Sequence, residues 1–146
     1  MRTIVVETPI ARPADHVFAY LRNHTNQLEW QAAHVMSVEV EPPGPSETGT
    51  RVHKVRRTPM GELSFTEQVI ALDEAERRWT ERTISGGIQG TEITWQVLPS
   101  GGDSTIRLEA AFRAKGVQKL LLPLIRRSAA KDWDTEFATL KELLEG

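Results

Sequence analysis

The sequence has no cysteine in its 146 residues, which excludes disulfides, thiol catalysis and cysteine-ligated zinc. It has no long apolar run either, because the longest, residues 120–125, falls far short of the roughly 20 residues that span a bilayer. The N-terminal apolar stretch is too short for a secretory signal, so a cytoplasmic protein without stable membrane insertion is expected. Neither sign of charge dominates, since 18 Lys and Arg stand against 20 Asp and Glu, for a net charge of −2. Such a chain has no field to attract a polyanion, and a nucleic-acid partner is not predicted.

What the chain does have is enough apolar sequence for one core. Hydrophobic residues make up 39% of it, and its length predicts a single domain over residues 1–146. Between residues 34 and 113, apolar and polar side chains alternate with a period of two, which is typical of antiparallel strands with one buried face. Clusters of Gly and Pro mark the turns. We therefore expect strands near residues 3–10, 34–41, 50–57, 62–69, 78–83, 91–97 and 106–113.

Helical spacing follows the first strand and returns at the C-terminus. Pro13 suits the first turn of a helix that carries Val17 and Leu21, and a second short helix follows near Trp30. Residues 117–144 predict a long amphipathic helix, which Pro123 should kink or begin. A one-sided sheet must cover its apolar face, and only this helix is long enough. The predicted fold class is α+β, a seven-stranded antiparallel sheet curled around a long C-terminal helix, with two short helices between strands 1 and 2.

Several short motifs, in this order and spacing, resemble one known superfamily. They are an Ile-x-x-Pro-x-x-x-Val-Phe opening at residues 10–18, Asn26 and Trp30, Gly49-Thr50, residues 102–105, and residues 140–145. In these the chain is similar to the START and Bet v 1-like helix-grip superfamily (SRPBCC), and most to its polyketide cyclase/dehydrase and lipid-transport branch. The resemblance implies a hydrophobic cavity between sheet and long helix for lipids, polyketides or aromatic compounds. It implies no catalytic residue, because the branch shares no catalytic motif to transfer.

Polar side chains on the expected inward face single out a pocket, because buried carboxylates are costly in a packed core and useful in a cavity. Alternatively, Glu67 and Glu81 lie near strand ends or pair with Lys54, Arg56 or Arg82. For Trp30, Trp79 and Trp95, cavity lining and core packing are equally expected. The residues expected to bind ligand are Trp30, His34, Met36, Phe65, Glu67, Trp79, Glu81, Ile93, Trp95, Leu121, Leu124 and Ser128.

Glu67, His53 and His34 are weak candidates for proton transfer, and the register of the third strand decides between them. One register places Val52 opposite Glu67, and a shift of one residue places His53 there instead. Only the second creates a His–carboxylate pair inside the pocket.

On the long helix, two faces are expected to have different roles. The stripe through Ile125, Ala129 and Trp133 should pack against the sheet, while Leu121, Leu124 and Ser128 share a side that should face the pocket. Residues 120–125 are apolar all round, which indicates full burial, a dimer contact or an apolar lid at the pocket mouth.

The remaining signals indicate little chemistry. His16 and His24 have no partner at metal-ligand spacing and are expected at the surface, so no metal and no cofactor are predicted. The favoured function is a non-catalytic binder of a hydrophobic small molecule, as a monomer or homodimer. The first alternative is a cyclase/dehydratase-type enzyme that uses a Glu/His pair, and the second is an interaction module with a solid core.

Overall fold

The computed structural model describes residues 3–59 and 61–146. In chain order its elements are β1 (Thr3–Ile10), α1 (Ala14–Arg22), the 3₁₀ helix η1 (His24–Asn26), α2 (Gln27–Trp30), β2 (Val35–Glu41), β3 (Arg51–Thr58), β4 (Gly61–Asp73), β5 (Arg78–Ser85), β6 (Glu92–Ser100), β7 (Asp103–Ala111), the 3₁₀ helix η2 (Gly116–Leu121) and α3 (Leu122–Glu145). The two short helices lie between the first two strands, and the long helix comes last. The fold predicted from the sequence is confirmed.

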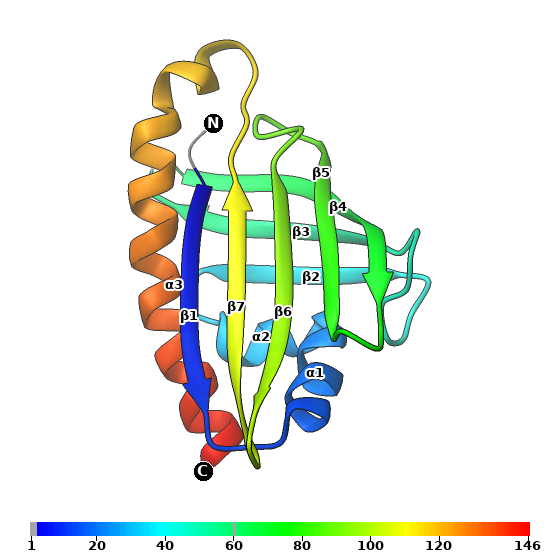
Figure 1. Cartoon of the computed structure of the whole chain (residues 1–146). Coiled ribbons are helices and arrows are strands. Elements are labelled where there is room, and N and C mark those ends of the chain that lie inside the picture. The colour runs from blue at the N-terminus through cyan, green and yellow to red at the C-terminus, as the bar shows by residue number, and fades with distance from the viewer. Residues whose placement is uncertain (1–2, 60) are drawn as a thin grey trace.

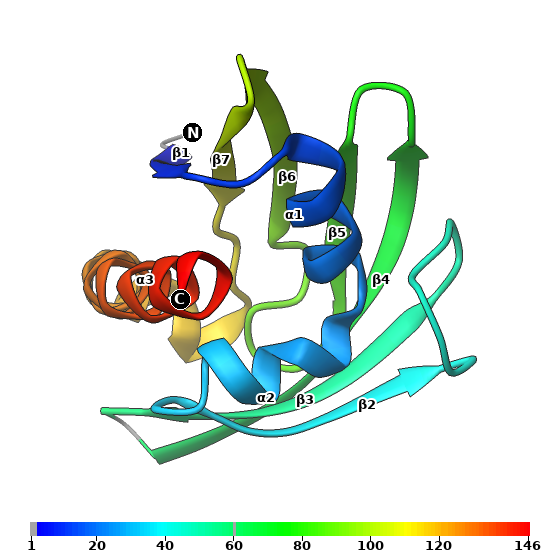
Figure 2. The ribbon, with the colours of Figure 1, turned by 90° about the horizontal axis from the view of Figure 1, so that it is seen from below.

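The seven strands form one antiparallel sheet in the order β1-β7-β6-β5-β4-β3-β2. Figure 1 shows β2, β3 and β4 crossing behind the strands that run beside α3. Seen from below, in Figure 2, the sheet bends around α3, α1 and α2 on its concave side. This concave side carries the inward residues of every strand, so a cavity between sheet and long helix would lie here.

The C-terminal helix begins later than residue 117, because residues 116–121 form the tighter 3₁₀ helix η2. Pro123 lies in the first turn of α3, where its missing N–H leaves no hydrogen bond unmade. At the other end, the backbone N–H of Ala11 donates to Glu145 Oε2 at 2.8 Å, and Lys141 Nζ donates to the carbonyl of Pro9 at 3.0 Å. The C-terminal end of α3 is therefore tied to the end of β1.

Stacked aromatic rings fill the half of the concave side that lies toward the C-terminal end of α3. Trp79 stacks on Trp95 with ring centroids 5.7 Å apart, and Phe137 of α3 stacks on Trp30 at 5.5 Å. All four rings are buried. Trp30 and Trp79 are thus part of the packed core, since neither lines the cavity described below.

The expectation that Met36 faces the pocket is wrong. A β-bulge between Val35 and Ser37 inserts Met36 as an extra residue, and its side chain is exposed. A bulge reverses the alternation on one side of it. Val35 therefore faces inward before the bulge, and Val38 and Val40 face inward after it.

Candidate ligand cavity

A cavity of about 180 Å³ lies between the concave side of the sheet and the first half of α3. Buried residues such as Glu81 and Thr91 form its inner end, and exposed residues such as Pro59, Glu62 and Leu124 form its mouth. Its apolar wall consists of Leu63, Phe65, Ile88, Ile93, Trp95, Phe112, Leu124, Ile125, Ala129 and Trp133. The volume is close to that of an engineered cavity of about 150 Å³ that holds benzene, so the enclosed space suits one or two rings.

Of the residues expected to bind ligand, those on the middle strands and two on the helix line this cavity. They are Phe65, Glu67, Glu81, Ile93, Trp95, Leu124 and Ser128. Leu121 does not line it, and neither does His34. The two faces of α3 are not separated as expected, because Ile125, Ala129 and Trp133 line the cavity together with Leu124 and Ser128.

Lys54 and Glu67 form an ion pair in the wall of the cavity. Lys54 Nζ lies 2.5 Å from Glu67 Oε1, and both side chains are more than nine-tenths buried. The pair exists because Val52, and not His53, lies opposite Glu67, which turns Lys54 inward as well. Sequence reasoning named Lys54 as a partner of Glu67 but did not assign it to the pocket.

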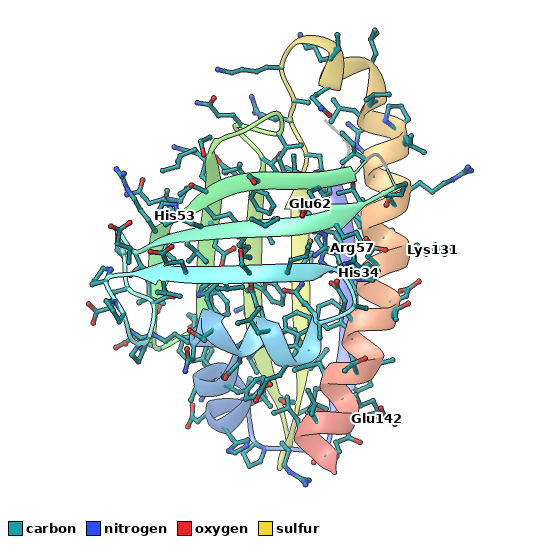
Figure 3. All side chains as sticks on the ribbon, turned by 180° about the vertical axis from the view of Figure 1, so that it is seen from behind. His34, His53, Arg57, Glu62, Lys131 and Glu142 are labelled. Atoms are coloured by element: carbon teal, nitrogen blue, oxygen red, sulfur yellow. The ribbon has the colours of Figure 1, made fainter. Side chains whose placement is uncertain are left out.

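The alternative register, with His53 opposite Glu67, is wrong. His53 lies on the outer face, where its Nδ1 is 2.8 Å from Thr66 Oγ1 and its Nε2 is 2.7 Å from Glu41 Oε2. Figure 3 shows His53 at the end of the strands that lies away from α3. His53 therefore has no access to the cavity and cannot exchange a proton with a ligand bound there.

Glu81 is held by His24, which is fully buried and not at the surface as expected. His24 Nε2 contacts Glu81 Oε1, and its Nδ1 lies 2.5 Å from the hydroxyl of Ser46. Trp79 Nε1 also donates to Glu81 Oε1 at 2.8 Å. His24 is buried because the chain turns at the extended Asn23 after α1 and η1 then places the imidazole against Trp79, a position that no spacing in the sequence reveals.

The buried carboxyls of Glu67 and Glu81 have pKa values that are shifted in opposite directions. Burial raises the pKa of Glu67 against the opposing charge of Lys54, and the charge of Glu81 adds to the rise. Burial acts on Glu81 in the same sense, but the charge and hydrogen bond of His24, aided by Lys54 and Trp79, lower its pKa to about 2. The inner end therefore combines a firmly ionised carboxylate with a carboxyl that takes up a proton more readily.

Four polar side chains around the inner end keep a hydrogen-bonding atom without a partner among residues 3–59 and 61–146. Three of these atoms are acceptors, Gln27 Oε1, Gln31 Oε1 and Glu81 Oε2, and one is a donor, Trp95 Nε1. All four residues line the cavity and are at least 95% buried. A buried polar atom without a partner is costly, so a ligand that offers hydroxyl or amino hydrogens to the acceptors gains from them.

An ion cluster connects α3 to the edge of the sheet beside the cavity. Arg56 Nη2 donates to Glu136 Oε2 at 2.9 Å, and His34 Nδ1 lies 2.8 Å from the same oxygen. His34 Nε2 lies 3.2 Å from Asp132 Oδ1, and Gln31 Nε2 donates to Glu136 Oε1 at 2.9 Å. Figure 3 shows His34 next to α3. His34 thus binds the carboxylates of α3 beside the cavity and does not line it.

Residues 120–125 are not fully buried. Of the three expectations for this segment, full burial is therefore excluded, and a dimer contact and an apolar lid stay open. Leu120 is 84% exposed and Leu124 is 47% exposed, and Val117 just before them is 75% exposed. Leu124 and Ile125 line the cavity mouth, so this apolar segment borders the opening.

Comparison with known proteins identifies the family. The family model for "Polyketide cyclase / dehydrase and lipid transport" matches residues 1–145. The chain belongs to this family. The START and Bet v 1-like resemblance found in the sequence is thereby confirmed, although a search of curated proteins finds no significant match.

Solved structures of other proteins show the same fold. TTHA0849 from Thermus thermophilus has a TM-score of 0.80 at 20% identity, covering 97% of this chain and 95% of that one. The Zhui aromatase/cyclase from a Streptomyces species also has a TM-score of 0.80, at 14% identity, covering 99% and 93%. Norcoclaurine synthase from Thalictrum flavum, solved with dopamine and hydroxybenzaldehyde, has a TM-score of 0.68 at 19% identity, covering 95% and 85%. At these identities the likeness shows the polyketide cyclase fold and leaves the ligand open.

Two other features are absent from the part of the chain that the structure describes, a metal site and a membrane-spanning helix. Across residues 3–59 and 61–146, no group of three His, Cys, Asp or Glu side chains is placed to hold a metal ion. Over the same residues, no helix is long and apolar enough to cross a membrane.

Proposed function

We propose that this member of the polyketide cyclase family binds a small aromatic molecule whose hydroxyl or amino groups reach the inner end of the cavity. The supporting observation is the cavity itself, with aromatic and aliphatic walls around the buried acceptors of Gln27, Gln31 and Glu81. Its volume of about 180 Å³ favours a fused two-ring molecule over a long acyl chain, unless part of the ligand protrudes from the mouth.

Calorimetric titration with 2-naphthol and with naphthalene tests this proposal. We expect 2-naphthol to bind saturably and more tightly, because its hydroxyl satisfies an acceptor that naphthalene leaves unpaired. Gln27→Leu should reduce the preference for 2-naphthol, whereas Gln68→Leu, an outward-facing control on β4, should preserve it. If neither compound binds and the purified protein carries no small molecule in native mass spectrometry, the binding function is refuted.

A second candidate function, acid–base catalysis on a bound carbonyl compound, is favoured by Lys54, Glu67 and Glu81. Burial moves the pKa of Glu67 upward, toward the range in which a general base works best at neutral pH. Lys54 can donate a hydrogen bond to a substrate carbonyl oxygen while Glu67 removes the proton from the adjacent carbon. Cyclisation and dehydration of polyketides both begin with this enolisation.

Deuterium exchange at the α-carbon of 2-tetralone, followed by NMR in D₂O, tests the catalytic candidate. The wild type should exchange faster than buffer, and Glu67→Gln should lose roughly 10²-fold or more of that rate. Glu62→Gln at the mouth is the matched control and should retain it. Exchange at the buffer rate by a wild type that still binds the ketone would leave the protein a binder.

A further inference from the structure

The segment between β7 and the first turns of α3 combines exposed apolar side chains with charge of one sign. Residues 113–127, called the tip here, contain five Lys and Arg and no Asp or Glu, although the whole chain has a net charge of −2. The apolar residues Val117, Leu120 and Leu124 are 75%, 84% and 47% exposed. In Figure 1 this segment rises beyond the ends of the strands.

In the part of the chain that the structure describes, the apolar side chains of η2 are not packed into the core, and the cations of the tip form no ion pair. No residue of η2 is buried, and neither Val117 nor Leu120 lines the cavity. Within residues 3–59 and 61–146, none of the five cations forms an ion pair; they are Arg113, Lys115, Lys119, Arg126 and Arg127. Outside the tip, six of the nine Arg side chains that the structure describes pair with a carboxylate, as Arg82 does with Glu92.

We propose that the tip docks reversibly on the surface of an anionic lipid bilayer. Leucine and valine side chains that protrude among Lys and Arg insert into the headgroup region, while the cations contact anionic headgroups. A second copy of the chain fits this surface less well, because a symmetric contact would bring two sets of five unpaired cations together. The tip is too short to span, and so the contact stays at the surface.

Docking through the tip would place the cavity mouth against the membrane. Gln118 of η2 lines the cavity, as do Leu124 and Ile125 of α3. A hydrophobic molecule could therefore pass between bilayer and cavity without crossing water. Glu62 is the acidic side chain that also lies at the mouth, and it limits how closely that rim approaches an anionic surface.

Flotation of the full chain with two kinds of vesicle tests the proposal. Vesicles of phosphatidylcholine mixed with phosphatidylserine should bind the protein at low salt and release it at high salt, and vesicles of phosphatidylcholine alone should bind it weakly. Leu120→Ser should lower partitioning about tenfold, and Lys119→Gln and Arg127→Gln about fivefold each. Leu28→Ser and Arg51→Gln, which change exposed residues outside the tip, should leave it unchanged.

The variants alter exposed side chains, so each should keep the melting temperature of the wild type. Equal flotation of the wild type and Leu120→Ser, or binding that ignores both salt and phosphatidylserine, overturns the proposal. Sedimentation velocity measures whether the chain dimerises through the tip. A wild-type dimer that Leu120→Ser dissociates, without vesicle binding, would show that a second copy covers the tip and would equally overturn it.

Discussion

Lys54 of β3 and Glu67 of β4 are diagonal neighbours on the cavity side of the sheet. Each charge is tolerated there because the other lies 2.5 Å away. Removing one partner leaves the other buried without compensation, whereas replacing both by apolar residues removes two desolvation costs together. The intact pair therefore adds little stability over two apolar residues, although breaking it is costly.

A double-mutant cycle tests the coupling between Lys54 and Glu67. Lys54→Met and Glu67→Met should each lower the free energy of unfolding by about 3–5 kcal/mol, because each leaves a buried charge unpaired. The double variant should recover most of that loss. Urea unfolding of the four proteins measures the coupling. Additive losses would mean that the two side chains do not interact in solution.

The shifted pKa of Glu81 predicts how stability depends on pH. In the folded protein this pKa is about 2, below an ordinary carboxyl value of about 4.3 in the unfolded chain. The stabilisation is therefore complete above about pH 4.3 and is lost as the pH falls toward 2, and its full size is about 3 kcal/mol. Glu67, whose pKa is raised, acts in the opposite sense and at higher pH, because its folded and unfolded forms differ in protonation only above about pH 4.3.

The difference in unfolding free energy between the wild type and Glu81→Gln isolates the contribution of Glu81. This difference should shrink steadily as the pH falls from about 4.3 to 2. Glu62→Gln, which changes an exposed carboxylate, should show no such trend. A difference that is independent of pH would refute the lowered pKa.

At the level of single residues, sequence reasoning found side chains on regular strands and missed those placed by turns. Glu67, Glu81, Ile93 and Trp95 follow from alternation alone. The position of His24 depends on how η1 turns after α1, and spacing along the chain carries no information about that. Gln27 and Gln31 were also missed, although their separation of four residues would have placed them on one face of a helix.

Among the elements, α3 carries both a packed half and a cavity half. Its buried residues all lie at or beyond Trp133, and they are Trp133, Glu136, Phe137, Leu140 and Leu144. Ser128 and its neighbours face the cavity instead. The sequence predicted that two faces running along the helix would have different roles. The two halves of the helix differ instead, because the aromatic core occupies only one end of the concave side.

Ser128→Phe tests whether the first half of α3 borders open space. The phenyl ring should fill the cavity and abolish binding of 2-naphthol, while the melting temperature stays within a few degrees of the wild type. In a close-packed core the same change would cost about 1–3 kcal/mol through overpacking. Ala138→Phe, on the exposed side of the same helix, should affect neither property. A large fall in melting temperature would show that Ser128 is packed.

The strands illustrate what alternation can and cannot predict about an element. The bounds of β1 agree with those expected, and the inward residues of β4 to β7 follow the expected parity. The prediction that Met36 faces inward was wrong because a β-bulge adds one residue to the strand, and nothing in the composition marks it. Alternation also could not decide the register of β3 on β4. It depends on the turn that pairs Thr58 with Gly61, and alternation alone permits both registers.

On the scale of the whole molecule, the two halves of α3 are attached with unequal strength. The second half packs on the aromatic core, joins the His34 and Arg56 cluster through Glu136, and ties to the end of β1 through Lys141 and Glu145. The first half borders the cavity and continues from the exposed η2. Local opening is easiest where few apolar contacts hold an element, so the entrance should open without unfolding the core.

Hydrogen exchange measured by mass spectrometry tests this unequal attachment. Amides of residues 122–130 should exchange faster than those of residues 133–144, because opening the first half exposes the cavity and leaves the aromatic core intact. Saturation with 2-naphthol should slow exchange in residues 122–130 and leave residues 133–144 nearly unchanged, since a ligand stabilises only the closed form that binds it. The Gln27→Leu variant, at the same ligand concentration, should show a smaller effect because fewer molecules are occupied. Uniform protection along α3 with no response to ligand would mean that the cavity opens by another route, between β3, β4 and η2.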